Sequence, residues 1–211
     1  MQPMSVQTPA RRGRWTKKDR RAQVAAVTLE IIAREGVHAA TLGRIAEAAG
    51  IATPSLYNHF SGRKEILELA SDLLLERVFA WIDSSTNPNM LERLRELGGS
   101  VHESRIATDQ EWVIMPLFEL ASAARAEGLI ERMGSNQLLV LQRFVEIVEE
   151  GKRQGTIRED ADPEVVGWSL MGHGWTKDFA LLEGLDQFVT NGTAKKVLDS
   201  ILAAVAAPAS S

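Results

Sequence analysis

The sequence predicts an all-α protein with a small N-terminal helical unit and a larger C-terminal one, about nine helices in total. Apolar residues recur at helical spacing along nearly the whole chain. Stretches of alternating polar and apolar residues rich in Val, Ile, Thr and aromatics, which would predict strands, are absent. Capping residues, glycines and prolines stand where the helical patterns begin and end.

The composition is typical of a globular protein. Of 211 residues, 45% are hydrophobic and 25% are charged, which is enough to form a sizeable core. The absence of cysteine excludes a disulfide scaffold and any metal site built on sulfur. No apolar run reaches the roughly 18 residues that span a bilayer, and no apolar block follows the basic N-terminus as in a secretory signal. We therefore expect a cytoplasmic protein.

The charge is divided unevenly. Residues 1–64 contain 11 Lys and Arg against 4 Asp and Glu, whereas the remaining residues contain 13 against 24, for a net charge of −4. A basic first third attached to an acidic remainder indicates an anionic polymer as the partner of one end only. A basic face that merely interacts with solvent is the alternative.

The first helix is predicted to begin at Thr16. Thr16 and Asp19 have the spacing of a capping box, and Gly36 suits the stop because glycine tolerates a positive φ. We expect residues 1–15 to form a flexible basic arm. Its three arginines could enter a minor groove or simply add solubility, and Trp15 should pack at the helix entry; the arginines are Arg11, Arg12 and Arg14.

Two short helices and a long one follow. Thr41 caps the first, Gly50 ends it, and Pro54 suits the first turn of the second. Ser61-Gly62 separates the second from a longer helix that reaches about residue 82. Five further helices are predicted over roughly 88–107, 110–126, 129–154, 163–184 and 193–206. Pro116 lies inside one of these patterns and should kink or split that helix.

The two short helices around Gly50 match a helix-turn-helix. A small core that fixes the second helix against the first can be formed by Leu42, Ile45, Ala46, Ile51, Leu56 and Phe60. This leaves a polar surface of Thr53, Ser55, Tyr57, Asn58 and His59, which could enter a major groove. The helix N-termini present unpaired amides to phosphates. On geometry alone, a helical hairpin without a DNA role remains an equal alternative.

The segment from Thr41 to Leu67 resembles the DNA-binding region of the TetR family of transcriptional repressors. The resemblance depends on Ile45-Ala46, Ala49-Gly50-Ile51, Leu56-Tyr57-Asn58-His59-Phe60 and Lys64-Glu65-Ile66-Leu67, in matching order and spacing. It is strong from about residue 16 to 67. It implies a flexible basic arm over 1–15, a helix-turn-helix DNA-binding domain over 16–62, and a helical ligand-binding and dimerisation domain over 63–211.

The resemblance also implies DNA contacts. Thr41 corresponds to a phosphate-contacting cap, Tyr57 and Lys64 to backbone contacts supported by His59, and Thr53, Pro54 and Ser55 to base-reading positions. Asn58 belongs to the same polar surface, and Arg44 is either a phosphate ligand or a solvated charge. Where the family often has Ser or Thr, this chain has Ala52, so the cap of the recognition helix could pass to Thr53.

The family resemblance implies a homodimer formed by the last two helices. On the helix over 163–184, one stripe contains Trp168, Met171, Gly172, Trp175, Phe179 and Leu182, and the opposite one Val166, Leu170, His173 and Leu181. A helix that is apolar on two faces must be covered on both. The final helix offers a matching stripe of Val197, Leu198, Ile201, Leu202 and Val205, and three glycines permit close approach, namely Gly167, Gly172 and Gly174.

A ligand pocket in the C-terminal domain is expected by the same resemblance. Candidate lining residues are the large side chains Trp81, Trp112, Met115, Phe118, Phe144, Met171 and Trp175, although such residues are usually plain core. His102 and His173 are candidate polar anchors. No metal ligand set or cofactor motif is found, so none is expected.

We therefore expect a ligand-responsive repressor that binds a near-palindromic double-stranded DNA operator as a homodimer and is released by a small hydrophobic or aromatic molecule. A ligand-independent architectural protein or an activator of the same fold is the alternative. Ser61 and Lys64 fit the Ser-x-x-Lys pattern of acyl-transfer enzymes, but the accompanying motifs are missing, so we do not expect an enzyme.

Overall fold

The computed structural model describes residues 16–107 and 111–208, without the side chains of residues 100–114. In these ranges it contains no strand, only an isolated bridge between Ile157 and Ala206, which confirms the all-α class. The helices are α1 (Lys17–Glu35), η1 (Val37–Ala39), α2 (Leu42–Ala48), α3 (Thr53–Leu56), α4 (Arg63–Ile82), α5 (Met90–Ala107), α6 (Glu111–Ala123), α7 (Ile130–Arg153), α8 (Pro163–Leu182), α9 (Gln187–Thr190) and α10 (Thr193–Val205). The proposed arm, with Arg11, Arg12, Arg14 and Trp15, lies outside the described residues.

The predicted helix ends agree with the structure where a capping signal exists. Thr16 Oγ1 accepts a hydrogen bond from the Asp19 amide at 3.1 Å, and the Asp19 carboxylate accepts one from the Thr16 amide at 3.3 Å. Gly36 ends α1 with φ of 83°, where a side chain would be strained. The sequence did not predict η1 and α9, because helices of three and four residues establish no periodicity and these two, unlike α3, belong to no recognised motif.

Pro116 does not split α6, contrary to one of the two expectations. The helix runs from Glu111 to Ala123 with the proline inside it. Leu120 and Ala123, which follow the proline, are buried in the core beneath the short helices. This packing holds the helix together across the position where proline removes one backbone hydrogen bond.

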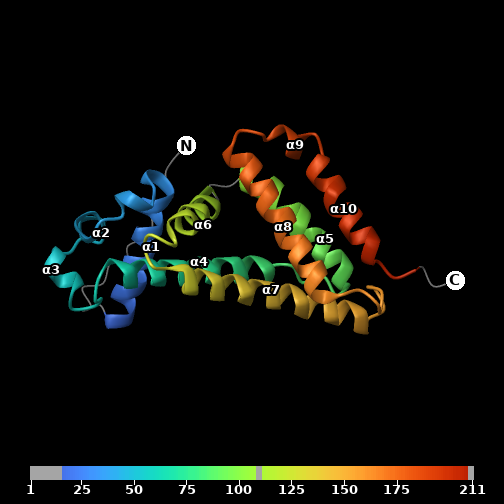
Figure 1. Ribbon diagram of the computed structural model, residues 1–211, viewed down its shortest axis with the longest axis horizontal. Helices are drawn as coiled ribbons and strands as arrows, with labels where there is room; N and C mark the ends of the chain where they lie inside the picture. The colour runs from blue at the N-terminus through green and yellow to red at the C-terminus, as the bar shows by residue number, and fades with distance from the viewer. Residues whose placement is uncertain (1–15, 108–110, 209–211) are drawn as a thin grey trace.

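The molecule has two hydrophobic cores connected by long helices (Figure 1). The first core joins α1 to α3 with the first half of α4, with α6 and with the beginning of α7. The second joins the end of α4 with α5, α7, α8 and α10. In Figure 1, α4 and α7 run side by side between the two cores. We call the part from α1 to α3 the head and the part around the second core the body.

The helix α8 has one buried and one exposed apolar face. Val166, Gly167, Leu170 and Met171 are buried, whereas Trp168 is 58% exposed and Phe179 50%. The two-faced pattern is therefore confirmed, but Met171 belongs to the buried face. A Cβ on Gly167 would lie 2.9 Å from Leu141 of α7, so that glycine permits close packing, whereas Gly172 and Gly174 have no heavy atom within 4 Å of such a Cβ.

Candidate nucleic-acid interface and effector cavity

The helices α2 and α3 form a helix-turn-helix. Gly50 makes the turn with φ of 66°, and the amide of Ile51 donates to the Ala46 carbonyl at 3.0 Å. Ile45 and Leu56 are almost fully buried in the core between the helices. Regular α-helix ends at Leu56, and hydrogen-bonded turns continue the recognition segment to Phe60.

The predicted DNA contacts are exposed or partly buried residues of the head and of the first turn of α4. The exposed ones are Thr41, Pro54, Tyr57, Asn58 and Lys64, and the partly buried ones are Arg44, Thr53, Ser55 and His59. Tyr57 is the most informative of them, because 59% of this aromatic residue is exposed although it follows the buried Leu56. An exposed tyrosine suits a contact to another molecule.

The N-cap of the recognition helix is Ala52, and Thr53 is the first helical residue. Ala52 makes no side-chain hydrogen bond to the helix. Thr53 already lies inside the helix, so it does not act as the cap in place of Ala52. Pro54, which has no backbone N–H, stands in the first turn and reduces the number of amides that need a partner. In α2, by contrast, Thr41 Oγ1 accepts from the Arg44 amide at 3.2 Å.

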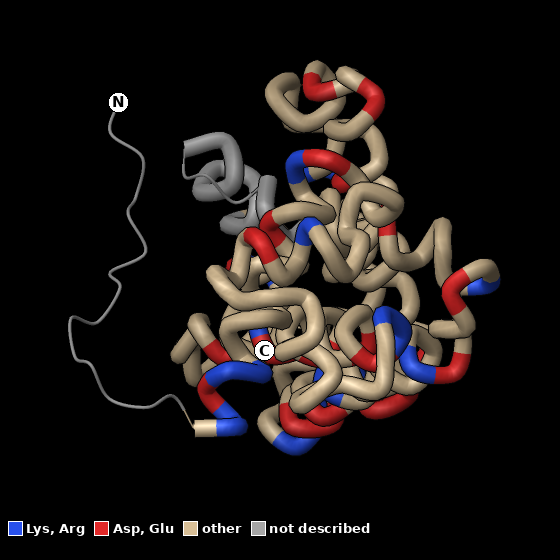
Figure 2. Tube along the Cα trace, turned by 90° about the vertical axis from the view of Figure 1, so that its left-hand side faces the viewer, with Lys and Arg blue, Asp and Glu red and all other residues tan. Residues whose placement is uncertain are grey.

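The two candidate phosphate ligands with positive charge are already paired. Arg44 contacts Glu35 at 2.8 Å and Glu47 at 3.4 Å. The hydrogen bond to Glu35 raises the pKa of Arg44, and the same bond lowers the pKa of Glu35. Lys64 lies 3.7 Å from Glu68. Either cation must exchange a carboxylate for a phosphate on binding DNA. Figure 2, which faces the head, shows Lys and Arg interspersed with Asp and Glu.

Arg21 fixes the end of the recognition segment and was not predicted. Its guanidinium donates to the His59 carbonyl at 2.5 Å and to Glu65 at 2.6 Å, and it lies 4.5 Å from the centre of the Phe60 ring. His59 Nδ1 is buried and has no hydrogen-bond partner among the described residues. Arg21 stands in a basic run of α1, which gives no sign of its inward orientation.

Arg63, at the first turn of α4, joins that helix to the head. Its guanidinium donates to the Ala40 carbonyl at 2.7 Å and to the Val37 carbonyl at 2.6 Å, and it pairs with Glu127 before α7. Glu119 of α6 accepts from the Val37 amide at 2.9 Å. We call this set of contacts the Arg63 junction. The partners lie 23 to 64 residues from Arg63 in sequence, so no local motif could predict them.

A cavity of about 120 Å³ lies in the body between α4, α5, α7 and α8. Most of its wall is apolar, and a few polar side chains converge on it. Four predicted ligand residues line it, namely Trp81, Phe144, Met171 and Trp175. Met115 and Phe118 lie outside it; Phe118 instead packs against Phe179 of α8 with ring centres 5.9 Å apart. The side chains of Trp112 and His102 lie outside the described part of the chain.

The polar residues of the cavity were mostly missed by the sequence. His173 lines it as predicted, and burial, assisted by the positive charge of Lys177, lowers the pKa of this imidazole. Ser71, Asn136, Gln137, Lys177 and Asp178 also line it. Lys177 and Asp178 are charged residues on an otherwise apolar face of α8, and that pattern could have identified them from the sequence.

Two features are not found in the described residues. No group of three or more His, Cys, Asp and Glu side chains there could hold a metal ion. No helix in the described ranges is long and apolar enough to cross a membrane.

Comparisons with known proteins agree with this architecture. Residues 25–70 match the family described as bacterial regulatory proteins, tetR family. The transcriptional repressor KstR2 of Mycobacterium tuberculosis is 29% identical over 154 residues, which cover 70% of this chain and 74% of the relative.

Solved structures of low sequence identity share the fold. A TetR transcription regulator from Haloarcula marismortui matches with a TM-score of 0.73 and 20% identity, over 90% of this chain and 99% of that one. The regulator FadR of Bacillus subtilis, in complex with stearoyl-CoA, matches with a TM-score of 0.66 and 23% identity, over 86% and 97%. The N-terminal domain of this chain, residues 25–70, thus belongs to the tetR family of bacterial regulatory proteins, which are DNA-binding regulators and not enzymes.

Proposed function

We propose that this regulator is a repressor that binds a near-palindromic operator as a homodimer and is released by a small hydrophobic or aromatic molecule. The observation that carries the proposal is that one helix, α4, both holds the head and walls the cavity. Its first residue, Arg63, forms the junction with the head, and five residues further along line the cavity, namely Ser71, Leu74, Leu75, Val78 and Trp81.

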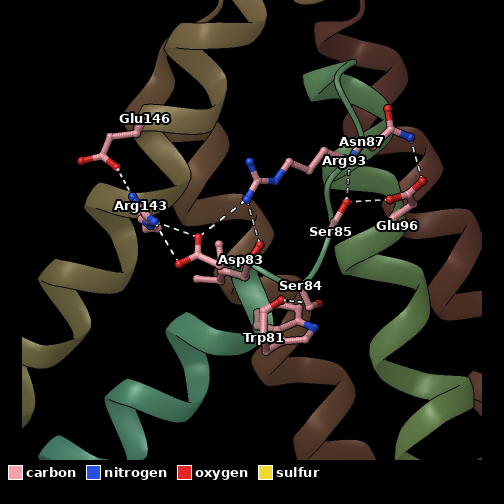
Figure 3. A network of polar contacts seen from close by, with 10 residues as sticks. Trp81, Asp83, Ser84, Ser85, Asn87, Arg93, Glu96, Arg143 and Glu146 are labelled. Carbon is pink, nitrogen blue, oxygen red and sulfur yellow. Dashed lines mark hydrogen bonds and ion pairs between the residues drawn. The ribbon is translucent and has the colours of Figure 1, made fainter.

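The far end of α4 is held in place. Asp83, directly after α4, accepts two hydrogen bonds from Arg143 of α7, at 2.8 and 3.0 Å, and Arg93 of α5 donates to the Ile82 carbonyl at 3.1 Å (Figure 3). A displacement of the middle of α4 is therefore carried toward its other end, where Arg63 contacts the head.

The cavity is too small for a whole ligand, so ligand binding would displace the helices around it. About 120 Å³ is less than the roughly 300–1,000 Å³ of pockets that bury a whole ligand. A ligand that enters must push the surrounding helices apart. A coupling of about 1–3 kcal/mol between cavity and head would weaken operator binding from several-fold to about a hundredfold.

The exposed apolar face of α8 supports dimerisation. Val165, Trp168, Phe179 and Leu182 are all at least 38% exposed, and Val197 of α10 is 46% exposed. Exposed apolar residues gathered on two neighbouring helices indicate a protein interface. In a dimer formed through this face, two recognition segments spaced about 34–36 Å apart would read successive major grooves of a palindrome.

We assign the DNA contacts to the outer side of the head. Thr53, Pro54 and Ser55, at the N-terminal end of the recognition helix, would reach base edges, assisted by Asn58. The phosphate contacts would be made by Thr41, Arg44, Tyr57 and Lys64, with His59 in support. The ligand contacts would include Trp81, Phe144, Met171 and Trp175. A ligand-independent architectural role is not favoured, because it would not account for the cavity in the body.

A selection of bound genomic DNA fragments tests the function. The full-length protein is mixed with sheared genomic DNA, and the retained fragments are sequenced with and without small-molecule extracts of the host cell. We expect a near-palindromic sequence whose recovery falls when the extract contains the ligand. Recovery of random fragments would contradict an operator-specific repressor. A palindrome that no extract releases would contradict ligand control alone.

A further inference from the structure

Three polar residues of the cavity wall stand on α4 and α7 where these helices leave the head. Asn136 of α7 is only 7% exposed and lines the cavity beside Gln137. Ser71 of α4 is 3% exposed and lines the same wall. We call these three residues the amide end of the cavity. Toward the other end of α4, the wall consists of apolar residues and Trp81.

The hydrogen bonds of Asn136 fix which of its atoms remains available. Asn136 Nδ2 donates to Ser71 Oγ at 2.9 Å and to Asp72 Oδ1 at 3.4 Å. A carboxylate can only accept, so the nitrogen must face Asp72 and the amide cannot be reversed. Ser71 Oγ in turn donates to the Met133 sulfur at 3.1 Å. Asn136 Oδ1 thus remains as an acceptor that receives no hydrogen bond from a described residue.

An acceptor in an apolar cavity selects a ligand that can donate. Asn136 Oδ1 receives no hydrogen bond from a described residue, and a hydroxyl group placed against it would supply one. An ether or a hydrocarbon would leave the oxygen unpaired. This asymmetry is the basis of discrimination between ligands of nearly the same shape.

The charges on the cavity wall favour a neutral ligand. Lys177 and Asp178 both line the cavity and are of opposite sign. His173, the remaining ionisable lining residue, has a pKa lowered by burial, which favours its uncharged form. The wall therefore carries no net charge, and burying a carboxylate there without a net positive charge would be costly.

The arrangement of the cavity along α4 favours an elongated ligand. The lining residues of α4 extend from Ser71 to Trp81, ten residues or roughly 15 Å along the helix axis. Trp81 Nε1 at the far end is buried and without a partner among the described residues, and it is fully covered, so a ligand does not reach it. Along α4, a hydrogen bond is thus offered only at the amide end, by Ser71, while the polar lining residues of α8 are His173, Lys177 and Asp178.

We infer that the effector is a neutral, elongated, apolar molecule with a hydroxyl group at one end, which donates to Asn136 Oδ1. The inference rests on the proposed ligand control, since it names the ligand class of the same cavity. It excludes fatty carboxylates and other anions as the preferred ligands.

Binding of four matched probes to the full-length protein tests the inference. The probes are 1-dodecanol, its methyl ether, dodecanoic acid and n-dodecane, and dissociation constants are measured by isothermal titration calorimetry. We expect the alcohol to bind about tenfold more tightly than the other three. Equal affinity for alcohol and ether, preference for the acid, or no binding of the alcohol would each overturn the inference.

Variants test whether the ligand hydroxyl contacts Asn136. Asn136→Ala should weaken alcohol binding about tenfold and leave ether binding unchanged, whereas Gln137→Ala on the adjacent position should retain the preference for the alcohol. Val78→Phe, which narrows the apolar part, should weaken all probes. Circular dichroism checks that each variant folds. Preference retained in Asn136→Ala, or probe binding unaffected by Val78→Phe, would overturn the assignment.

Operator binding of the same preparations separates the two proposals. If a cell extract releases DNA but the alcohol does not bind, the ligand class is wrong and repression under ligand control stands. If the alcohol binds as expected but neither it nor any extract changes operator affinity, the cavity assignment stands and ligand control is wrong.

Discussion

A single guanidinium joins the beginning of α4 to the head and to the turn before α7. Arg63 hydrogen-bonds two backbone carbonyls of the head, those of Val37 and Ala40, and also pairs with Glu127. Its side chain is 23% exposed, so the carbonyls that it satisfies are partly withdrawn from water. A lysine cannot reproduce this pattern, because it lacks the planar fork of donors.

Replacing Arg63 should therefore destabilise the protein. We expect Arg63→Gln to lower the free energy of unfolding by about 2–3 kcal/mol, since carbonyls and a carboxylate lose a charged donor. Arg63→Lys should lie between this variant and the original protein. Urea denaturation followed by circular dichroism measures the effect. As a control, Arg153→Gln removes an exposed pair with Glu150 and should change stability by less than about 0.5 kcal/mol. Equal effects of Arg63→Gln and Arg153→Gln would refute the role of the junction.

Glu65 joins α1 to the beginning of α4. Its carboxylate accepts from the Ser61 amide at 2.7 Å, from the Ser61 hydroxyl at 2.9 Å and from Arg21 at 2.6 Å. The hydrogen bond from the Ser61 backbone, followed by those from Arg21 and the Ser61 hydroxyl, lowers the pKa of Glu65 to about 2.

The stability contributed by Glu65 should depend on pH. A depressed carboxyl pKa stabilises the fold fully above the unfolded value, near 4.5, and this contribution is lost as pH falls toward about 2. At pH 6 we expect Glu65→Gln to be less stable by about 1 kcal/mol, because the group is partly exposed. Between pH 4.5 and 2 the difference should shrink. Urea denaturation at several pH values measures it, and a difference independent of pH would contradict the assignment.

At the scale of elements, the recognition segment combines two kinds of contact. Its N-terminal residues Thr53 and Ser55 are partly buried, whereas the exposed Tyr57 lies past the last regular turn, and Lys64 stands on α4. In the proposed assignment, base edges and phosphates are thus contacted from different elements. Substitutions in the two groups should have different consequences for DNA binding.

Binding to a library of operator variants separates these two roles. Tyr57→Phe and Lys64→Ala should weaken binding about equally for all sequences, whereas Thr53→Ala and Ser55→Ala should change which sequences are preferred. Arg158→Ala, in an exposed pair with Asp160 between α7 and α8, serves as the control and should change neither. A uniform loss from all four variants would remove the base-reading role of Thr53 and Ser55.

At the scale of the whole molecule, the exposed faces of α8 and α10 should hold two copies together. Val197→Glu places a charge on this face and should convert the dimer into a monomer, as measured by analytical ultracentrifugation. Leu138→Glu, on α7 at a residue that is 67% exposed, introduces the same charge elsewhere and should leave the dimer intact. Dimers that survive Val197→Glu but not Leu138→Glu would place the interface on α7.

DNA binding should also be strongly salt-dependent. Each phosphate neutralised by a cation contributes about −0.9 to the slope of log affinity against log salt concentration. Lys64→Ala should reduce the magnitude of this slope by about 1 if the lysine exchanges Glu68 for a phosphate. Fluorescence anisotropy with a labelled operator at several salt concentrations measures the slope, and an unchanged slope would exclude a phosphate contact by Lys64.

The sequence by itself determined the features that are encoded locally. The capping box of Thr16 and Asp19, the helix cap at Thr41 and the turn at Gly50 each depend on residues within a few positions of one another. The two apolar faces of α8 also follow from spacing along one helix. The helix-turn-helix and the family resemblance depend on the same short-range information.

The tertiary structure decided which side chains from distant elements meet. The Arg63 junction, the inward orientation of Arg21 and the amide end of the cavity each join residues that are tens of positions apart. The positions of Met171 and Phe118 could not be predicted for the same reason. Helical spacing shows which residues share a face, but not which neighbouring helix covers that face. Contacts of this kind are fixed by how whole helices pack, and packing depends on the summed shape of both surfaces rather than on any local pattern.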